Sequence, residues 1–277
     1  MKITYLALLL GIFSSCSPIV EKTEETPPQR KEILSSKLQT ILDFSGVKGV
    51  ILVYDLQENA YYANDFEWAE KGRLPASTFK IPNSIIALET GVVENDSTLF
   101  KWDGQKRYLK IWEQDLLFRE AFQLSCVPCY QDVARRIGPE RMKEYLQKFQ
   151  YGNMVVDTAT IDLFWLEGDS KISPFEEIDF LKRFYRSELP ISKRTETMVK
   201  SMMVMETTDQ YKLSGKTGWA IRNGHNNGWF VGFVETFEKV YFFATNIEPS
   251  ETFNMDMFPM IRREITEKGL KDLGFIQ

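Results

Sequence analysis

Strand-like segments lie at both ends of this chain, and mainly helical segments lie between them. Residues 49–55 form an apolar run typical of a buried strand, and residues 60–63 follow at a spacing that suits a hairpin partner. Three more strand-like segments, 211–217, 227–235 and 240–246, lie near the C-terminus. Because a two-stranded hairpin is not stable alone, we expect it to join the C-terminal strands in one antiparallel sheet. The predicted fold class is therefore α+β.

The expected helices carry apolar residues at three- and four-residue spacing. They span 33–44, 83–89, 115–123, 127–137, 139–149, 174–187, 192–205 and 256–273. Most of them fall between the two groups of strands, so we expect an all-helical subdomain inserted into the sheet domain. The two lobes should meet in a cleft beside Ser77.

The N-terminus differs in kind from the rest of the chain. Lys2 precedes an apolar run at 3–13, which is too short to span a bilayer comfortably and is typical of a secretory signal. The run ends in Ser14-Ser15-Cys16, which resembles a bacterial lipoprotein cleavage box. We expect residues 1–16 to be a signal peptide. Two alternatives remain open for Cys16, which are lipidation and removal by ordinary cleavage.

Residues 17–30 are polar and contain prolines, so we expect a flexible tether there. The body at 31–277 would then lie outside the cytoplasm, in the periplasm, either free or anchored to the membrane through Cys16. The net charge of −5 is mild, and no basic run or phosphate-binding loop occurs. These features argue against a nucleic-acid partner.

A candidate nucleophile lies at the start of the expected helix 83–89. Ser77 precedes Lys80 by three residues, which places the two side chains on one helix face. A serine needs a neighbouring base, and the chain has a single histidine, His225, in a segment that reads as a turn. Lysine is the better candidate base if burial or a covalent change removes its charge. By itself Ser-x-x-Lys is a weak motif, because a capping serine before a surface lysine is more common.

Further motifs strengthen this interpretation. The chain contains, in order, Ser125-Cys126-Val127, Tyr151-Gly152-Asn153, Phe164-Trp165-Leu166 and Lys216-Thr217-Gly218. Together with Ser77-Thr78-Phe79-Lys80, they resemble the class D (oxacillinase-type) serine β-lactamases over roughly residues 31–274. The resemblance implies a β-lactamase and penicillin-binding-protein-like fold. It also implies hydrolysis of β-lactams through an acyl-serine intermediate, with no metal.

The resemblance implies specific roles for these residues. Ser77 would be the nucleophile, and Lys80, carboxylated by CO₂ to N6-carboxylysine, would be the general base. Trp165 would donate a hydrogen bond to the carbamate. Ser125 would relay a proton toward the lactam nitrogen, and Lys216 would supply positive charge beside it.

Other residues would bind the substrate. Backbone N–H groups of Ser77 and Trp219 would form the oxyanion hole. Thr217 and Gly218 would face the substrate from an edge strand. Arg262 or its neighbour Arg263 would bind the substrate carboxylate, and we favour Arg262. Two further groups would support the site. Val127 would form a hydrophobic wall over Lys80, and Tyr151, Gly152 and Asn153 would be structural residues of the cleft floor.

Several alternatives stay open from the sequence. Cys126 and Cys129 are either buried thiols or a local disulfide. The protein is a monomer or a homodimer. A β-lactam sensor or penicillin-binding protein would share these motifs but acylate without efficient turnover. A non-catalytic envelope lipoprotein would leave Ser77 and Lys80 unexplained, and a D-alanyl-D-alanine peptidase would normally carry a polar Ser-x-Asn motif at Ser125.

Overall fold

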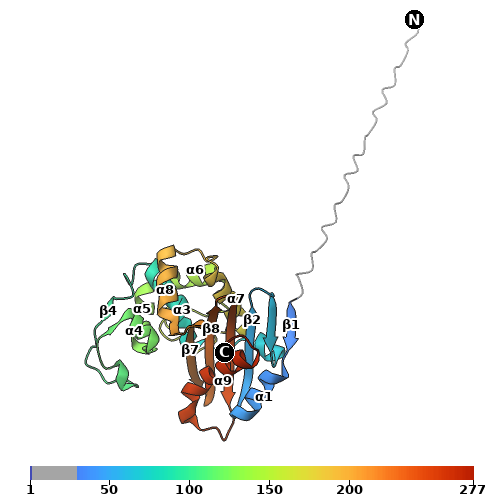
Figure 1. Cartoon of the computed structure of the whole chain (residues 1–277). Coiled ribbons are helices and arrows are strands. Elements are labelled where there is room, and N and C mark those ends of the chain that lie inside the picture. Colours follow the sequence, from blue (N-terminus) through green and yellow to red (C-terminus); the bar gives the residue numbers. More distant parts are fainter. Residues whose placement is uncertain (2–29) are drawn as a thin grey trace. The chain divides into compact units, whose positions relative to one another are not determined.

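A seven-stranded sheet joins the two ends of the chain in the computed structural model, which describes Met1 and residues 30–277 (Figure 1). Its strand order is β1-β3-β2-β9-β8-β7-β6. The strands are β1 (Lys31–Leu34), β2 (Val47–Asp55), β3 (Ala60–Ala63), β6 (Val204–Thr207), β7 (Tyr211–Arg222), β8 (His225–Thr236) and β9 (Val240–Pro249). β2 pairs antiparallel with β9, so the predicted union of the N-terminal hairpin with the C-terminal strands is confirmed.

Nine α-helices are found in the described part of the chain. They are α1 (Ser36–Ser45), α2 (Phe66–Glu70), α3 (Lys80–Glu89), α4 (Phe118–Gln123), α5 (Val127–Ile137), α6 (Pro139–Phe149), α7 (Pro174–Tyr185), α8 (Lys193–Met203) and α9 (Phe258–Asp272). The described part of the chain also contains three short 3₁₀ helices, which are η1 (Ala76–Phe79), η2 (Lys110–Trp112) and η3 (Met255–Met257).

Side chains that alternate between the two faces of the sheet contribute to two separate hydrophobic cores. On β2, Val50 and Leu52 face a large core that includes α3, α5 and α7, whereas Ile51 and Val53 face a smaller core with α1 and α9. Successive strand residues point to opposite faces of a sheet, so a continuous apolar run such as 50–53 indicates a strand covered on both sides. The structure is thus layered, with α1 and α9 on one face of the sheet (Figure 1).

Short strands account for most of the differences from the predicted elements. The expected helix 33–44 begins only at Ser36, because β1 occupies its first residues and pairs parallel with β3. The sheet is therefore mixed rather than wholly antiparallel. β6 occupies the end of the expected helix 192–205 and pairs with β7. The inserted region is not all-helical, since β4 (Leu99–Phe100) pairs with β5 (Leu116–Leu117).

Helix boundaries follow ordinary capping chemistry where the prediction was accurate. α5 and α6 have the predicted limits, and between them lies Gly138, whose φ of 81° is unfavourable for other residues. Pro139 opens α6, where its missing N–H is harmless. Ser173 and Glu176 form a reciprocal capping box that fixes the start of α7.

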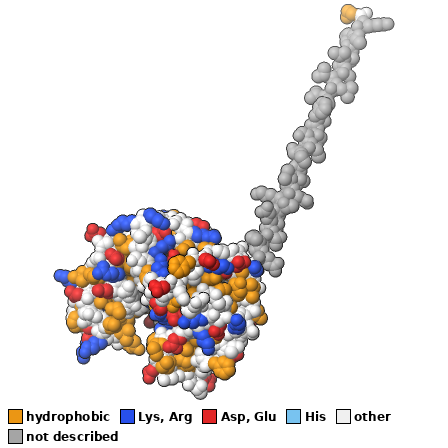
Figure 2. Space-filling model, in the orientation of Figure 1, with side chains coloured by type: hydrophobic (Ala, Val, Ile, Leu, Met, Phe, Trp, Pro, Cys, Tyr) orange, Lys and Arg blue, Asp and Glu red, His pale blue; other side chains and the backbone are white. Residues whose placement is uncertain are grey.

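The surface carries both signs of charge. On the face shown in Figure 2, Lys and Arg side chains are interspersed with Asp and Glu. Within residues 30–277, no helix is long and apolar enough to cross a membrane. The expected signal peptide at 1–16, with Cys16, and nearly all of the tether at 17–30 lie outside the described residues.

Candidate active site

Ser77 and Lys80 form a buried pair at the junction of η1 and α3. Lys80 Nζ donates a hydrogen bond of 2.9 Å to Ser77 Oγ, as their spacing predicts. The Lys80 side chain is wholly buried, and Ser77 is 7% exposed. Burial lowers the pKa of Lys80 to about 7. At neutral pH a large fraction of this amine is therefore uncharged and able to accept a proton from a hydroxyl.

Trp165 lies against the same turn. Its ring stacks on Phe79, with centroids 5.3 Å apart, and its backbone oxygen accepts a 2.9 Å hydrogen bond from Ala76 N–H. The indole nitrogen of Trp165 is buried and has no hydrogen-bond partner among the described residues. A buried N–H without a partner is rare, so this one is available to an additional acceptor.

Ser125 and Lys216 form a second serine–lysine pair. Lys216 donates to Ser125 Oγ and, over 2.9 Å, to the backbone oxygen of Thr217. Burial holds the pKa of Lys216 well below its usual value, and the positive charges of Lys80 and Arg262 add to this effect. Ser125 has a φ of 52°, an uncommon conformation for a residue with a side chain. Cys126, which follows Ser125, occupies the N-cap of α5.

Strand β7 passes very close to the turn that carries Ser77. A Cβ atom on Gly218 would lie 3.0 Å from the Pro75 carbonyl oxygen and 3.2 Å from Thr78 Cγ2. Only glycine allows this approach without displacing the turn. Trp219 follows Gly218 directly, so its backbone is adjacent to this close approach between β7 and the turn.

At the β7 side of the sheet, the edge strand is β6, whereas we had expected β7. β6 covers β7 only along 212–214, so Lys216, Thr217 and Gly218 lie beyond its pairing. A cavity of about 290 Å³ adjoins this part of β7. Lys216, Thr217, Phe122, Met202 and Met205 are among the residues that line it.

Arg262 and Arg263 have different environments. Arg262 is 6% exposed and donates to the backbone oxygens of Gly218, Phe258 and Pro259. Burial lowers its pKa to about 10. Arg263 instead forms ion pairs with Glu206 and Glu267. Arg262 is therefore the arginine that lies beside β7, where it contacts Gly218.

The comparisons with known proteins agree with this arrangement. Residues 48–260 match the family of the penicillin binding protein transpeptidase domain. The chain is 42% identical over 233 residues to β-lactamase OXA-10 of Pseudomonas aeruginosa, covering 83% of this chain and 86% of that one. It is 38% identical to OXA-5 of the same organism over 99% of this chain and 98% of that one.

Solved structures specify the class. The class D β-lactamase YbXI from Nostoc superposes with a TM-score of 0.82 at 45% identity, covering 86% of this chain and 98% of that chain. The class D β-lactamase from Sebaldella termitidis has a TM-score of 0.84 at 39% identity, covering 90% and 100%. The chain belongs to the class D β-lactamase family. The predicted family and fold class are thereby confirmed.

This class D family member also has a buried network that the sequence did not reveal. Glu177 on α7 is fully buried, and its Oε1 atom lies 2.7 Å from Thr78 Oγ1 and 2.9 Å from the Tyr151 hydroxyl. Thr78 Oγ1 also lies 2.8 Å from the Pro75 carbonyl oxygen. Tyr151, which we expected to be structural, thus contacts the Glu177 carboxyl, and this carboxyl in turn contacts Thr78 in the turn that carries Ser77. The sequence spacing indicates that Glu177 is on the buried face of α7, because it lies three residues after Pro174 and four before Leu181.

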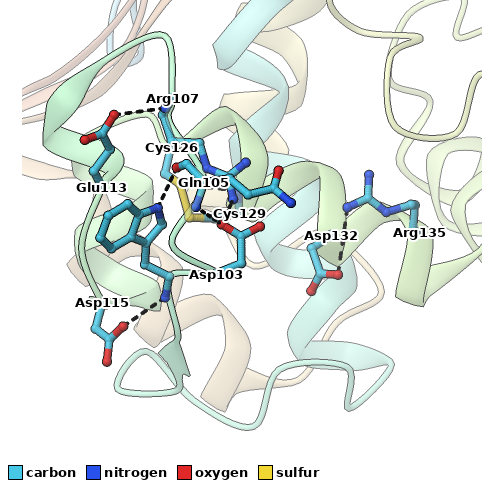
Figure 3. A network of polar contacts seen from close by, with 10 residues as sticks. Asp103, Gln105, Arg107, Glu113, Asp115, Cys126, Cys129, Asp132 and Arg135 are labelled. Carbon is cyan, nitrogen blue, oxygen red and sulfur yellow. Dashed lines mark hydrogen bonds and ion pairs between the residues drawn. A yellow bond between two sulfur atoms is a disulfide. The ribbon is translucent and has the colours of Figure 1, made fainter.

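The two cysteines left open by the sequence form a disulfide next to Ser125. Cys126 and Cys129 are bonded across the first turn of α5, with Cα atoms 5.4 Å apart. Figure 3 shows this disulfide beside a polar network, in which Arg107 contacts Glu113 and α5 carries the Asp132–Arg135 pair. Val127, which is also on α5, is half-buried and packs on the large core.

His225 is exposed at the turn joining β7 and β8, away from the serine–lysine pairs.

Proposed function

We propose that this class D family member hydrolyses β-lactams through an ester formed between Ser77 Oγ and the lactam carbonyl carbon. The observation that carries the proposal is the buried Ser77–Lys80 pair, whose lysine has a pKa of about 7. The relatives are named as β-lactamases, and the match includes most of the chain.

Lys80 would act as the general base after carboxylation. Its neutral amine would form an N–C bond to CO₂ and release one proton, which leaves an anionic carbamate. The unpartnered indole N–H of Trp165 supports this modification, because it would supply a hydrogen bond to the new carboxylate. The hydrophobic surroundings of Lys80 favour the uncharged amine that reacts with CO₂.

In acylation, carboxylated Lys80 would take the Ser77 proton as Oγ attacks the carbonyl carbon. The C–N bond of the lactam then breaks, and its nitrogen receives a proton from Ser125. Lys216 would return a proton to Ser125, as supported by their direct hydrogen bond. Proton transfer by such positioned groups contributes typically 10²–10⁴-fold to a rate.

In deacylation, the same base would act on water. Once the proton taken from Ser77 has been passed on to restore Lys216, carboxylated Lys80 would take a proton from a water molecule, whose oxygen attacks the ester carbonyl carbon. The carbamate would return that proton to Ser77 Oγ as the ester C–O bond breaks, which regenerates the free serine and the anionic base. Backbone N–H groups of Ser77 and Trp219 would stabilise the oxyanion in both steps, which is worth about 3 kcal/mol per donor. The close approach of Gly218 to the nucleophile turn supports this pairing.

Substrate binding would use the residues around the exposed part of β7. Arg262 would bind the substrate carboxylate with Thr217, while Gly218 and Val127 shape the walls. Arg262 already donates to three backbone oxygens, which hold its guanidinium in place. Arg262 is buried and forms no ion pair with the described residues, whereas Arg263 forms two, and this difference supports the assignment.

The proposed location is outside the cytoplasm, with Cys16 as a lipid anchor. The apolar run before Cys16 supports export. Cell fractionation of the full chain and of Cys16→Ala tests this part. A shift from membrane to soluble periplasmic fractions supports the anchor, and identical fractionation contradicts it.

The catalytic proposal is tested with benzylpenicillin and the full chain. Wild type should turn over many equivalents, and Ser77→Ala should release no product. Intact mass after a short incubation should show the acyl adduct on wild type only. A single stoichiometric adduct without further product would indicate a penicillin-binding protein or sensor instead.

A further inference from the structure

The network beneath Ser77 contains more contacts than the available hydrogens can satisfy if Glu177 is ionised. Three oxygen–oxygen contacts are present, namely Thr78 to Pro75 O, Thr78 to Glu177, and Tyr151 to Glu177, at 2.8, 2.7 and 2.9 Å. Each needs one hydrogen. The hydroxyls of Thr78 and Tyr151 supply two, and the Pro75 carbonyl supplies none.

A proton on Glu177 satisfies all three contacts. Thr78 then donates to Pro75 O, Glu177 donates to Thr78 Oγ1, and Tyr151 donates to Glu177. Without that proton, two of these oxygens approach to less than 3 Å with no hydrogen between them, and the residues that carry them are buried. We propose that Glu177 is a positioning residue that stays a neutral carboxylic acid and holds Thr78, and with it the Ser77 turn, by donating its own proton.

The surroundings of Glu177 favour the neutral form. The side chain is fully buried, and its Oε2 atom has no hydrogen-bond partner among the described residues. Two titratable groups act on it, Tyr151 from the loop after α6 and the carboxylate of Glu176 on α7. Burial raises the pKa of Glu177 to about 7, while its contacts with Thr78 and Tyr151 partly oppose that rise.

A neutral Glu177 also suits the chemistry proposed nearby. Thr78 lies two residues before Lys80, in the turn that would carry an anionic carbamate. An ionised Glu177 would place a second buried negative charge against this turn, and like charges in a low-dielectric site disfavour each other. The activity part of the inference therefore rests on the proposed function, whereas the protonation of Glu177 does not.

Glu177→Gln is the decisive variant, because an amide nitrogen carries two hydrogens and can donate to both Thr78 and Tyr151. Glu176→Gln is its matched control, since it makes the same substitution at an exposed neighbouring position and keeps an oxygen for the Ser173 N–H. The full-length wild type and both variants are unfolded by denaturant between pH 4 and pH 9.

The sign of the pH effect follows from the raised pKa. The folded protein holds the Glu177 proton more tightly than the unfolded chain, whose carboxyl has a pKa of 4.5. Wild type therefore loses stability relative to Glu177→Gln as the pH rises from 4.5 to about 7. The change in the folding equilibrium constant should be on the order of 100-fold. Glu176→Gln should not reproduce it.

Two further measurements separate positioning from general stability. The infrared spectrum of wild type at pH 6 should contain a protonated carboxylic acid band that Glu177→Gln lacks. The ratio of kcat/KM for Glu177→Gln to that of wild type should rise between pH 6 and pH 8.5, because only wild type ionises at this position. Glu176→Gln should keep the wild-type profile.

The outcomes are distinct. A pH-independent stability difference together with no lost infrared band means that Glu177 is ionised, and overturns the inference. A protonated Glu177 with an unchanged kcat/KM ratio overturns its positioning role. If wild type hydrolyses no β-lactam, the proposed function fails, and the unfolding and infrared results still decide the protonation state.

Discussion

Lys80 Nζ lies 2.9 Å from Ser77 Oγ inside the protein, with the lysine side chain wholly buried. A charged ammonium in such a place would carry a large desolvation penalty, so the fold favours the neutral amine. The same burial that makes the lysine basic toward Ser77 also makes it reactive toward CO₂.

Removing the base should abolish turnover. We expect Lys80→Ala to lower steady-state hydrolysis of benzylpenicillin by roughly 10³-fold or more, because one residue serves both acylation and deacylation. Lys71→Ala, which changes an exposed lysine paired with Glu67, is the control and should be unaffected. Wild-type hydrolysis by Lys80→Ala would refute the mechanism.

Loss of the Trp165 indole N–H should weaken the retention of the carbamate on Lys80. Trp165→Phe keeps an aromatic ring against Phe79 but removes the donor. A hydrogen bond to a charged group contributes about 1.5–3 kcal/mol, so the bicarbonate concentration for half-maximal activity should rise roughly 10- to 100-fold. The carbamate signal in ¹³C NMR with labelled bicarbonate should fall in parallel. An unchanged signal would remove Trp165 from this role, and Trp102→Phe, an exposed site, serves as control.

The two adjacent arginines should differ in effect. Arg262→Ala should raise KM for benzylpenicillin roughly 10- to 100-fold, since a charge-assisted hydrogen bond to the substrate carboxylate is lost. Arg263→Ala should change stability through Glu206 and Glu267 and leave KM close to wild type. The reverse pattern would transfer the carboxylate-binding role to Arg263.

The pKa of Lys80 gives a pH dependence with a definite sign. Burial lowers this pKa from 10.5 to about 7, so the folded state binds the proton less tightly than the unfolded chain. The stability of wild type relative to Lys80→Ala should therefore fall as the pH decreases from 10.5 to about 7, in CO₂-free buffer. Activity should also decline below about pH 7 as the amine becomes protonated. A stability difference that is flat across this range would contradict the lowered pKa.

The disulfide next to Ser125 should contribute modestly to stability. Cys126 and Cys129 close a loop with a separation of only three residues, so the loop-entropy model gives about 2 kcal/mol. Replacing both with serine should lower the free energy of unfolding by that amount. Denaturant titration of wild type with and without reductant provides the comparison, and the double variant should be insensitive to reductant.

The sequence predicted best where local chemistry decides the structure. The limits of α5 and α6 follow from Gly138-Pro139 and from apolar spacing, and the reach of Lys80 to Ser77 follows from a three-residue interval. β1 and β6 were missed because each is a four-residue strand directly beside a helix, and the predicted helices 33–44 and 192–205 extended over part of them. The pairing of β1 with β3 also joins residues far apart in the chain, such as Lys31 and Ala60.

Two features of the site depend on tertiary contacts that spacing alone does not give. Glu177 follows Glu176 in the first turn of α7, where acidic residues commonly interact with the helix dipole and remain solvated. Its spacing from Pro174 and Leu181 places it on the buried face, but only the packing of α7 against the Ser77 turn shows its contacts with Thr78 and Tyr151. The edge position of β6, which leaves Lys216 and Thr217 beyond its pairing, likewise depends on strand order.

The most direct test of the central claim is steady-state hydrolysis of a chromogenic cephalosporin and of benzylpenicillin, with and without added bicarbonate. If carboxylated Lys80 is the base for both steps, wild type should turn over continuously, at a rate that increases with bicarbonate. A single stoichiometric burst that bicarbonate does not extend would contradict it, and would indicate acylation of Ser77 without release.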